Sequence, residues 1–388
     1  MKTNYALLLV ATVMATGFAS LGQPFQSGSN GSYGSLDVTT GDKTLDVPPD
    51  GIFHCTTINI SRTLRFNRNA LNTPVYLLAT GDVTLVSTAF IDVSGTRGSG
   101  STPGFGGPGG FDGGAPGSVG LPGGDGLGPG AGKAGSSLSD GTQAGSGSFA
   151  TASNSNPVGN RGATYGSPLL FPLIGGSGGG GATGNPGWGG GGGGGALLIA
   201  SNTRITHNGL VRAWGGQALS ASVLNTGSGG AVRMIAPVIT GTGSIDVRGN
   251  GGSNNNGDGR TRIDALDRIG IGVNFFPNTT ATVGGLMAVF PDPLPRLDIV
   301  EAGGKVIPVD SGPAQVLLPS GSSPNQTVKV RAKDFGQRVP IRLVLTPDSG
   351  PAQNYDAQID NSVTNPAETA INVTFPVNVL THVRVWTR

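Results

Sequence analysis

The sequence has little charge and a single cysteine, and each shortage excludes a class of protein. Asp, Glu, Lys and Arg make up 12% of the 388 residues, and the 24 basic residues are scattered among 22 acidic ones. Nucleic-acid phosphates are bound by dense basic patches, so the composition excludes a nucleic-acid partner. Cys55 has no second cysteine to pair with, so packing and backbone hydrogen bonds must stabilise the chain. We expect Cys55 to lie in the core.

Residues that build helices and metal sites are scarce as well. No long segment repeats its apolar residues with helical periodicity, and 71 Gly and 27 Pro interrupt the chain, which predicts an all-β protein. The three histidines do not have the spacing of a zinc site. Asn254, Asn256 and Asp258 are ordered as in a calcium loop, but Ala265 stands where the bidentate acid belongs. We therefore expect a polar turn there, and no metal or cofactor.

No apolar run is long enough to span a membrane, and the one at the N-terminus has another use. Lys2 precedes an apolar stretch that begins at Ala6, and small residues around Ala19 offer a cleavage point. These features predict a secretory signal peptide over residues 1–20 and no transmembrane segment. The protein is therefore expected to be exported, to the extracellular space or the cell surface, with the periplasm as an alternative.

Short strands recur along the chain with glycine beside them. Alternating apolar residues at 75–95, 194–216, 229–252 and 284–290 indicate half-buried strands, and Gly-Gly precedes the last three. The first three segments carry a second short strand that glycine follows closely. These second strands are Ile91–Val93, Val211–Ala213 and Ile245–Val247. The second and third copies are offset by 34 to 35 residues, a period typical of solenoids.

The sequence leaves open which apolar side chains face the core. Ala196, Leu198 and Ala200 are expected to stack on apolar residues of adjacent turns, but Leu197 and Ile199 are apolar too. The expected stacking partners are Ala231, Val232, Met234 and Leu286. Apolar residues on both faces are expected where another segment covers the outer face of a sheet.

The segment 98–195 has a different texture, with glycine at every third position in several runs and five charged residues in all. We expect it to be an insertion between the first and second repeats, and two structures are compatible with it. A flexible loop is favoured, because collagen-like triplets would have to continue without interruption. The alternative is a packed set of extended, polyproline-II-like glycine strands, in which glycine lets backbones approach closely.

The C-terminal part, residues 296–388, contains seven short alternating segments separated by turn signals such as DSGP and NPAE. The predicted strands are Leu297–Ile299, Val316–Leu318, Val328–Val330, Ile341–Leu345, Tyr355–Ile359, Ile371–Phe375 and Val383–Val385. This number and spacing of strands predicts a β-sandwich of immunoglobulin type without an internal disulfide.

The repeats of Gly-Gly followed by an alternating strand, joined by glycine-rich excursions, resemble the right-handed parallel β-helix proteins of the pectate-lyase-like superfamily. They are most similar to glycine-rich secreted members from Gram-negative bacteria. The resemblance covers roughly residues 36–290 and implies a coil of short parallel strands with loops projecting from one edge. The expected order is signal peptide (1–20), first part of the β-helix (21–97), insertion (98–195), second part of the β-helix (196–295) and sandwich (296–388).

Two rows of outward side chains are the candidate ligand site. If the turns align, Asp92, Arg212 and Asp246 form one row, and Ser94, Trp214 and Arg248 form another. Either the rows are a structural ladder of alternating charge on a solvated face, which is favoured, or they bind a sugar with Trp214 as a stacking platform. Trp188, alone among glycines, is a further candidate for ligand or partner contact.

No catalytic residue can be assigned, because paired acids at the spacing of a glycosidase are missing from these rows. The leading hypothesis is therefore a non-enzymatic surface or matrix protein that is structural, adhesive or glycan-binding. Its expected partners are polysaccharides or cell-surface components, and self-assembly is open. A polysaccharide lyase or hydrolase on the same fold is the alternative, with Asp92, Arg212 and Asp246 as its site.

Overall fold

The computed structural model describes residues 24–118, 121–135, 144–153, 160–184, 187–217, 225–249, 257–290, 295–309 and 314–387. The predicted signal peptide lies outside these ranges, as do Asn254 and Asn256 of the calcium-like turn. The described chain is all-β, as predicted, with two parallel sheets, two antiparallel sheets and the 3-10 turn η3 (Asn278–Thr280). No helix in the described part is long and apolar enough to cross a membrane.

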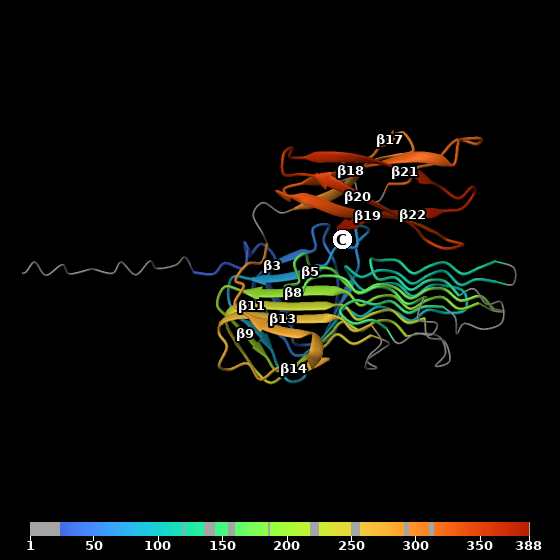
Figure 1. The fold of residues 1–388 in the computed structure, drawn as a ribbon. Coiled ribbons are helices and arrows are strands. Elements are labelled where there is room, and N and C mark those ends of the chain that lie inside the picture. Colours follow the sequence, from blue (N-terminus) through green and yellow to red (C-terminus); the bar gives the residue numbers. More distant parts are fainter. Residues whose placement is uncertain are drawn as a thin grey trace, which may run out of the picture.

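The two parallel sheets face each other, and the chain alternates between them. The nine-stranded sheet consists of β1 (Gly34–Val38), β3 (Ile52–Ile60), β5 (Val75–Ala79), β6 (Val83–Leu85), β8 (Ala196–Ser201), β9 (Arg204–His207), β11 (Ala231–Thr240), β13 (Arg260–Asp267) and β15 (Ala281–Gly284). The six-stranded sheet consists of β2 (Lys43–Asp46), β4 (Thr63–Asn67), β7 (Phe90–Asp92), β10 (Leu210–Arg212), β12 (Ser244–Asp246) and β14 (Asn274–Phe276). Each turn adds parallel strands to both sheets, and we call this arrangement the parallel stack (Figure 1).

The core of the parallel stack is built from columns of aligned side chains. Leu77, Ile199, Met234 and Ile263 occupy matching register positions in successive strands, and all four are buried in one cluster. The inward set therefore contains Leu197 and Ile199. The expectation that Ala196, Leu198 and Ala200 stack on Val232 and Met234 is wrong. Val232 is in register with Leu197 and Met234 with Ile199, so the inward residues of β8 are the other alternate set.

The outward apolar set is buried by other segments, as the two-faced apolarity indicated. Leu198 and Ala200 pack in a second cluster with Leu173, from the glycine-rich segment, and with Met287, Val289 and Phe290. The expected fourth repeat at 284–290 is not a strand after Gly284, because β15 ends there. Residues 286–290 instead cross the outer face of the nine-stranded sheet.

The described residues of 98–195 are packed, so the flexible-loop preference is wrong for them. Gly189–Ala196 lies among six other passes of the chain. Its backbone amides point in three directions, and the direction repeats every third residue. The amides at 189, 192 and 195 donate to carbonyls at 99, 96 and 93, and those at 190, 193 and 196 donate to carbonyls at 114, 111 and 108. The amides at 191 and 194 donate to carbonyls at 225 and 228. Carbonyls of this pass accept from amides at 179 and 176, at 104 and 107, and at 216.

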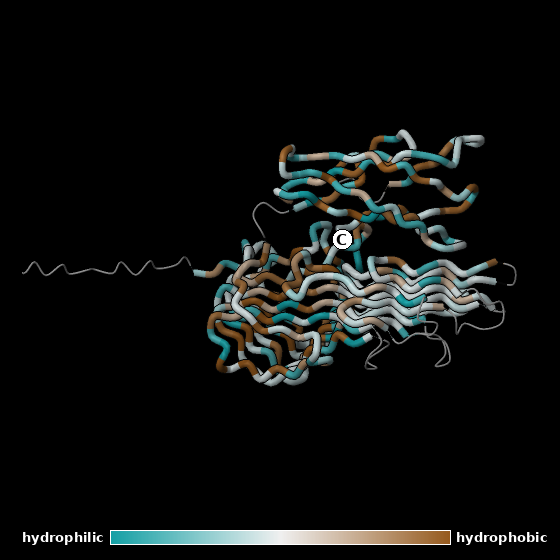
Figure 2. Tube along the Cα trace, in the orientation of Figure 1, coloured by the Kyte–Doolittle hydropathy of each residue, from teal (hydrophilic) through white to brown (hydrophobic). Residues whose placement is uncertain are grey.

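A hydrogen-bonding direction that repeats every third residue is the property of a polyproline-II helix, which has three residues per turn and no internal hydrogen bonds. Figure 1 shows these passes running side by side beyond the ends of β8, β11 and β13. We call them the glycine bundle. Residues 213–217, 225–230 and 257–259 from later turns join it, so the bundle is larger than the predicted insertion. In Figure 2 apolar residues gather in the parallel stack, while the bundle has intermediate hydropathy.

The C-terminal residues form two antiparallel sheets that share one core, here called the sheet pair. One sheet contains β16 (Arg296–Ala302), β17 (Lys305–Val306), β18 (Asn325–Lys333) and β21 (Ala367–Thr374). The other contains β19 (Arg338–Pro347), β20 (Gln353–Asp360) and β22 (Thr381–Thr387). The predicted strand at Val316–Leu318 is wrong, because these residues form no ladder, although Val316 packs against the core.

The sheet pair rests on the glycine bundle. Gly350 forms a parallel bridge with Gly124, and the Ser349 hydroxyl donates to the carbonyl of Pro122 at 3.4 Å. The ring of Trp386 meets the ring of Phe111 edge-on, with centroids 6.3 Å apart. In Figure 1, β3 and β14 are labelled at opposite ends of the parallel stack, and the sheet pair lies beyond the β3 end.

Candidate binding groove

The outward side chains of the six-stranded sheet form the row that the sequence predicted. Arg212 is in register with Asp92 on one neighbouring strand and with Asp246 on the other. The row continues to Arg65 beyond Asp92 and to Phe276 beyond Asp246. Parallel in-register strands stack equivalent side chains at about 4.8 Å, so these groups stand close enough to interact directly.

The second predicted row is also present, at the point where the strands enter the glycine bundle. The amide of Trp214 donates to the Ser94 hydroxyl at 3.0 Å, and the amide of Gly95 donates to the carbonyl of Trp214 at 2.9 Å. On the other side, the amide of Gly215 donates to the carbonyl of Arg248 at 3.1 Å. Backbone hydrogen bonds therefore fix Ser94, Trp214 and Arg248 side by side.

The carboxylates of the first row are bound by arginines. Arg212 donates to Asp92 through Nε at 3.3 Å and Nη2 at 2.6 Å, and Arg248 grips Asp246 in the same way at 3.0 and 2.7 Å. Burial raises the pKa of Asp92, but hydrogen bonds from Arg212 and Ser94 outweigh it and leave the pKa below its ordinary value. Asp92 is therefore a charged partner for arginine and a poor proton donor.

The arginines are also stacked on aromatic rings. The guanidinium of Arg212 lies over the ring of Trp214 at 4.3 Å and over the ring of Phe90 at 4.6 Å. Arg248 lies over Phe276 at 5.3 Å. These cation–π contacts and ion pairs restrict the arginines to few rotamers, so the surface they form is preorganised.

A groove of about 770 Å³ opens over these rows where the six-stranded sheet meets the glycine bundle. Its charged lining comprises Arg65, Arg68, Arg97, Arg212 and Asp92, and its aromatic lining includes Phe66, Phe105 and Trp214. Of the four guanidinium groups, that of Arg212 is paired with Asp92 and that of Arg68 with Asp112, so the four cations exceed the two carboxylates and the groove keeps a positive charge. The side chain of Arg65 is 49% exposed, whereas that of Asp92 is 12% exposed, so a ligand in the groove meets cations first.

The sequence missed the groove residues that lie outside the repeat pattern. Phe105 comes from the glycine bundle and lies under the guanidinium of Arg68 at 5.1 Å, and Arg68 pairs with Asp112. No pattern joins these residues to the strands, because their placement depends on the packing of the bundle. Arg65 could have been found, since β4 has the same outward position as β7 and β10.

Trp188 is not part of the groove. It lies in the glycine bundle, half-buried, and its backbone exchanges two hydrogen bonds with Ala182. Asp246 and Arg248 lie further along the rows, beyond the groove lining. The described residues contain no group of three His, Cys, Asp or Glu side chains that would hold a metal. Asp258, the described acid of the calcium-like turn, accepts a hydrogen bond from the amide of Gly249 at 3.1 Å.

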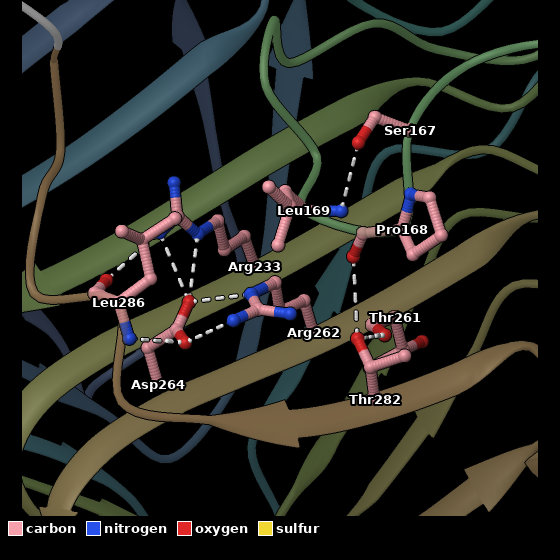
Figure 3. Close-up of polar contacts among 9 residues, drawn as sticks. All are labelled: Ser167, Pro168, Leu169, Arg233, Thr261, Arg262, Asp264, Thr282 and Leu286. Atoms are coloured by element: carbon pink, nitrogen blue, oxygen red, sulfur yellow. Dashed lines mark hydrogen bonds and ion pairs between the residues drawn. The ribbon is translucent and has the colours of Figure 1, made fainter.

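Figure 3 shows a second charged cluster, on the outer face of the nine-stranded sheet, in which the side chains of Arg233 and Asp264 are fully buried. Asp264 accepts hydrogen bonds from Arg233 on β11 and from Arg262 on β13, at 2.7 to 3.2 Å. Its carboxylate also accepts from the amide of Leu286 at 2.8 Å, and the carbonyl of Leu286 accepts from Arg233 at 3.0 Å. The cluster fastens the crossing segment 286–290 to the sheet and offers no entry to a ligand.

No family model matches this chain, and comparisons with curated proteins and with solved structures find no match either. The groove must therefore be interpreted from its own chemistry.

Proposed function

We propose that this chain is an exported, non-enzymatic glycan-binding protein of the cell surface or the extracellular matrix. Its scaffold would be a right-handed parallel β-helix of the pectate-lyase-like type, followed by an immunoglobulin-like sandwich. The in-register parallel sheets and the glycine-rich passes that leave one edge of the turns support the first part. The two small antiparallel sheets with a common core support the second.

The observation that carries the function is the ring of Trp214, stacked on Arg212 in a groove lined by four arginines. Aromatic faces stack on the apolar faces of sugar rings, and guanidinium forks bind carboxylate and sulfate groups through paired hydrogen bonds. A groove that is open to solvent suits a polymer better than an enclosed pocket would. The ligand that fits this combination is a polysaccharide with negative charges.

Catalysis on the same surface is disfavoured by the state of its acids. A glycosidase needs one carboxyl group with a raised pKa as proton donor, and the pKa of Asp92 is lowered. Asp246 is engaged by both Nε and Nη2 of Arg248. The rows therefore favour binding over bond cleavage.

The test is a polysaccharide panel applied to the chain without its predicted signal peptide, residues 21–388. Retention on acidic and neutral polymers and release of new chain ends would be measured together. We expect retention on an acidic polymer, no release of ends, and weaker retention at high salt. Trp214→Ala should weaken retention about tenfold or more without changing the melting temperature, because a stacked aromatic contact contributes on the order of 1–3 kcal/mol.

Two variants sharpen this test. Trp214→Phe keeps a ring over Arg212 and should retain part of the affinity, whereas Arg342→Ala removes an arginine paired with Asp356 on the sheet pair and should change nothing. Release of chain ends by the parent protein would overturn the non-enzymatic assignment. Absence of retention on every polymer would overturn glycan binding itself.

A further inference from the structure

One combination of side chains occurs three times among the described residues, in and beside the groove. In each copy an arginine lies over an aromatic ring and donates two hydrogen bonds to an aspartate, which also accepts one from a backbone amide. The three sets are Asp92 with Arg212 and Trp214, Asp246 with Arg248 and Phe276, and Asp112 with Arg68 and Phe105. We call each set a platform and name it by its ring.

The repeat of the parallel stack explains only two of the platforms. Asp92 and Asp246 occupy equal register positions on either side of Arg212, so the stacking of equivalent turns produces their platforms. The third platform is built otherwise, because its arginine follows β4 and its ring and aspartate come from the glycine bundle. A by-product of the repeat would not reappear in unrelated segments, which favours a function for the combination itself.

Each platform presents its ring to solvent in a fixed orientation. Phe105 is 51% exposed and Phe276 is 42% exposed, while Trp214 is half-buried in the groove. The arginine behind each ring is engaged by its aspartate, so the cation–π contact holds the ring in place. Exposed aromatic rings that are held rigidly bind a ligand at little cost in side-chain entropy, and they are typical of binding surfaces.

The three rings are evenly spaced across the strands. The pass that contains Thr96 lies between Phe105 and Trp214 and is hydrogen-bonded to both of them. Likewise, β12 lies between β10, which leads into Trp214, and β14, which carries Phe276. Each interval is therefore two strand spacings, or about 10 Å between backbones. Phe276 is level with Arg212, two residues before Trp214, so the line of rings crosses the strands obliquely.

We propose that Phe105, Trp214 and Phe276 form one aromatic track that binds a single extended chain of a linear acidic glycan, with sugar rings stacked on successive platforms. One sugar ring is shorter than the interval between platforms, whereas a chain of linked rings spans it. The exposed Arg65 lies in the groove with Phe105 and Trp214, so acidic groups of the chain meet a positive charge there. The track rests on the proposed function and specifies it, because it selects linear glycans long enough to reach all three platforms.

The experiment titrates residues 21–388 with oligomers of defined length from hyaluronan, alginate and chondroitin sulfate, followed by calorimetry. For a glycan that binds, we expect the affinity to rise in steps of about tenfold as the oligomer reaches a second and then a third platform. Phe105→Ala and Phe276→Ala should each remove one step and leave the affinity of the shortest binding oligomer unchanged. Trp214→Ala should weaken oligomers of every length, because the shortest ones bind over Trp214 in the groove.

Two further variants separate stacking from a merely structural role. Phe276→Trp keeps a ring on its platform and should retain the step that Phe276→Ala removes. Tyr33→Ala is the matched control, because Tyr33 is 45% exposed but packs against Phe53 beside the nine-stranded sheet, away from the track, and it should change no affinity. The melting temperatures of the Phe105 and Phe276 variants should match that of the parent, since both rings are exposed.

Three outcomes would overturn the track. An affinity that is equal for short and long oligomers, and that Trp214→Ala still weakens, would leave glycan binding in place without a track. Long oligomers that bind Phe105→Ala and Phe276→Ala as tightly as the parent would have the same meaning. A parent chain that binds none of the three glycans at any length also overturns the track, and the polysaccharide panel shows separately whether glycan binding stands.

Discussion

Gly193 lies against Gly176 so closely that it has no room for a side chain: a Cβ on Gly193 would lie 2.0 Å from the carbonyl oxygen of Gly176. The same residue donates its amide to Phe111 and accepts from Gly107, so it cannot move away from one neighbour without losing another. The glycine bundle is therefore held by backbone hydrogen bonds that only glycine permits.

Gly193→Ala is expected to destabilise the protein by more than about 3 kcal/mol, because overpacking against fixed backbone costs more than overpacking among side chains. Urea unfolding followed by circular dichroism measures the loss. Gly41→Ala is the matched control, since a Cβ at Gly41 meets nothing within 4 Å, and it should stay within about 0.5 kcal/mol of the parent. A Gly193→Ala protein as stable as Gly41→Ala would show that the bundle is looser than described.

Removal of the buried carboxylate tests the cluster in Figure 3. Asp264→Ala leaves Arg233 fully buried without its counter-ion and frees the amide of Leu286, so a loss of about 3–5 kcal/mol is expected. Limited proteolysis should then cut within 286–290 in the variant and not in the parent. Asp360→Ala is the matched control: it breaks an exposed pair with Arg338 and should leave the urea midpoint and the proteolysis pattern of the parent unchanged.

The strands of the parallel stack and the alignment of Asp92, Arg212 and Asp246 were predictable from sequence. Alternation and glycine spacing repeat in each turn, and a parallel stack converts equal spacing into equal position. The inward parity was not predictable, because Leu197 and Leu198 are both apolar and both buried. One faces the core of the stack, and the other faces a cover that comes from elsewhere in the chain.

The glycine bundle was predictable only as an alternative, for a physical reason. Its passes are joined by hydrogen bonds between backbone amides and carbonyls, which nearly every residue carries. No pattern of side chains therefore predicts which passes lie side by side. Glycine at every third position is the one trace in the sequence. The positions of groove residues such as Phe105 and Arg68 depend on that packing, so the sequence alone could not place them in the groove.

Cys55 provides a probe of opening, because it is the sole thiol of the chain. It is buried in the core as predicted, and burial raises the pKa of its thiol to about 12. An aromatic disulfide reagent at pH 8 should therefore leave the native protein unlabelled and react fully in urea. Thr40→Cys places a thiol on an exposed loop and should react at once. Equal labelling rates for Cys55 and for the thiol introduced by Thr40→Cys, both in the folded protein, would contradict the burial of Cys55.

His207 is expected to make stability depend on pH between 6.5 and about 4. Burial lowers the pKa of His207 from 6.5 to about 4, while the hydrogen bond of Nε2 to the carbonyl of Ser244 opposes the shift only in part. In this interval His207 is protonated in the unfolded chain and neutral in the folded chain, so the free energy of unfolding falls as the pH is lowered. The stability is fully present above pH 6.5, and about 3 kcal/mol of it is lost by pH 4.

Urea titrations at a series of pH values measure this slope. His207→Gln removes the titrating group, so its unfolding free energy should change less over the same interval, whatever its absolute stability. His54→Gln controls for the loss of a histidine, because His54 is half-buried near the first turn and contacts the amide of Asn30. Parallel curves for the parent and His207→Gln would contradict the assignment, because the pH dependence would then belong to the carboxylates.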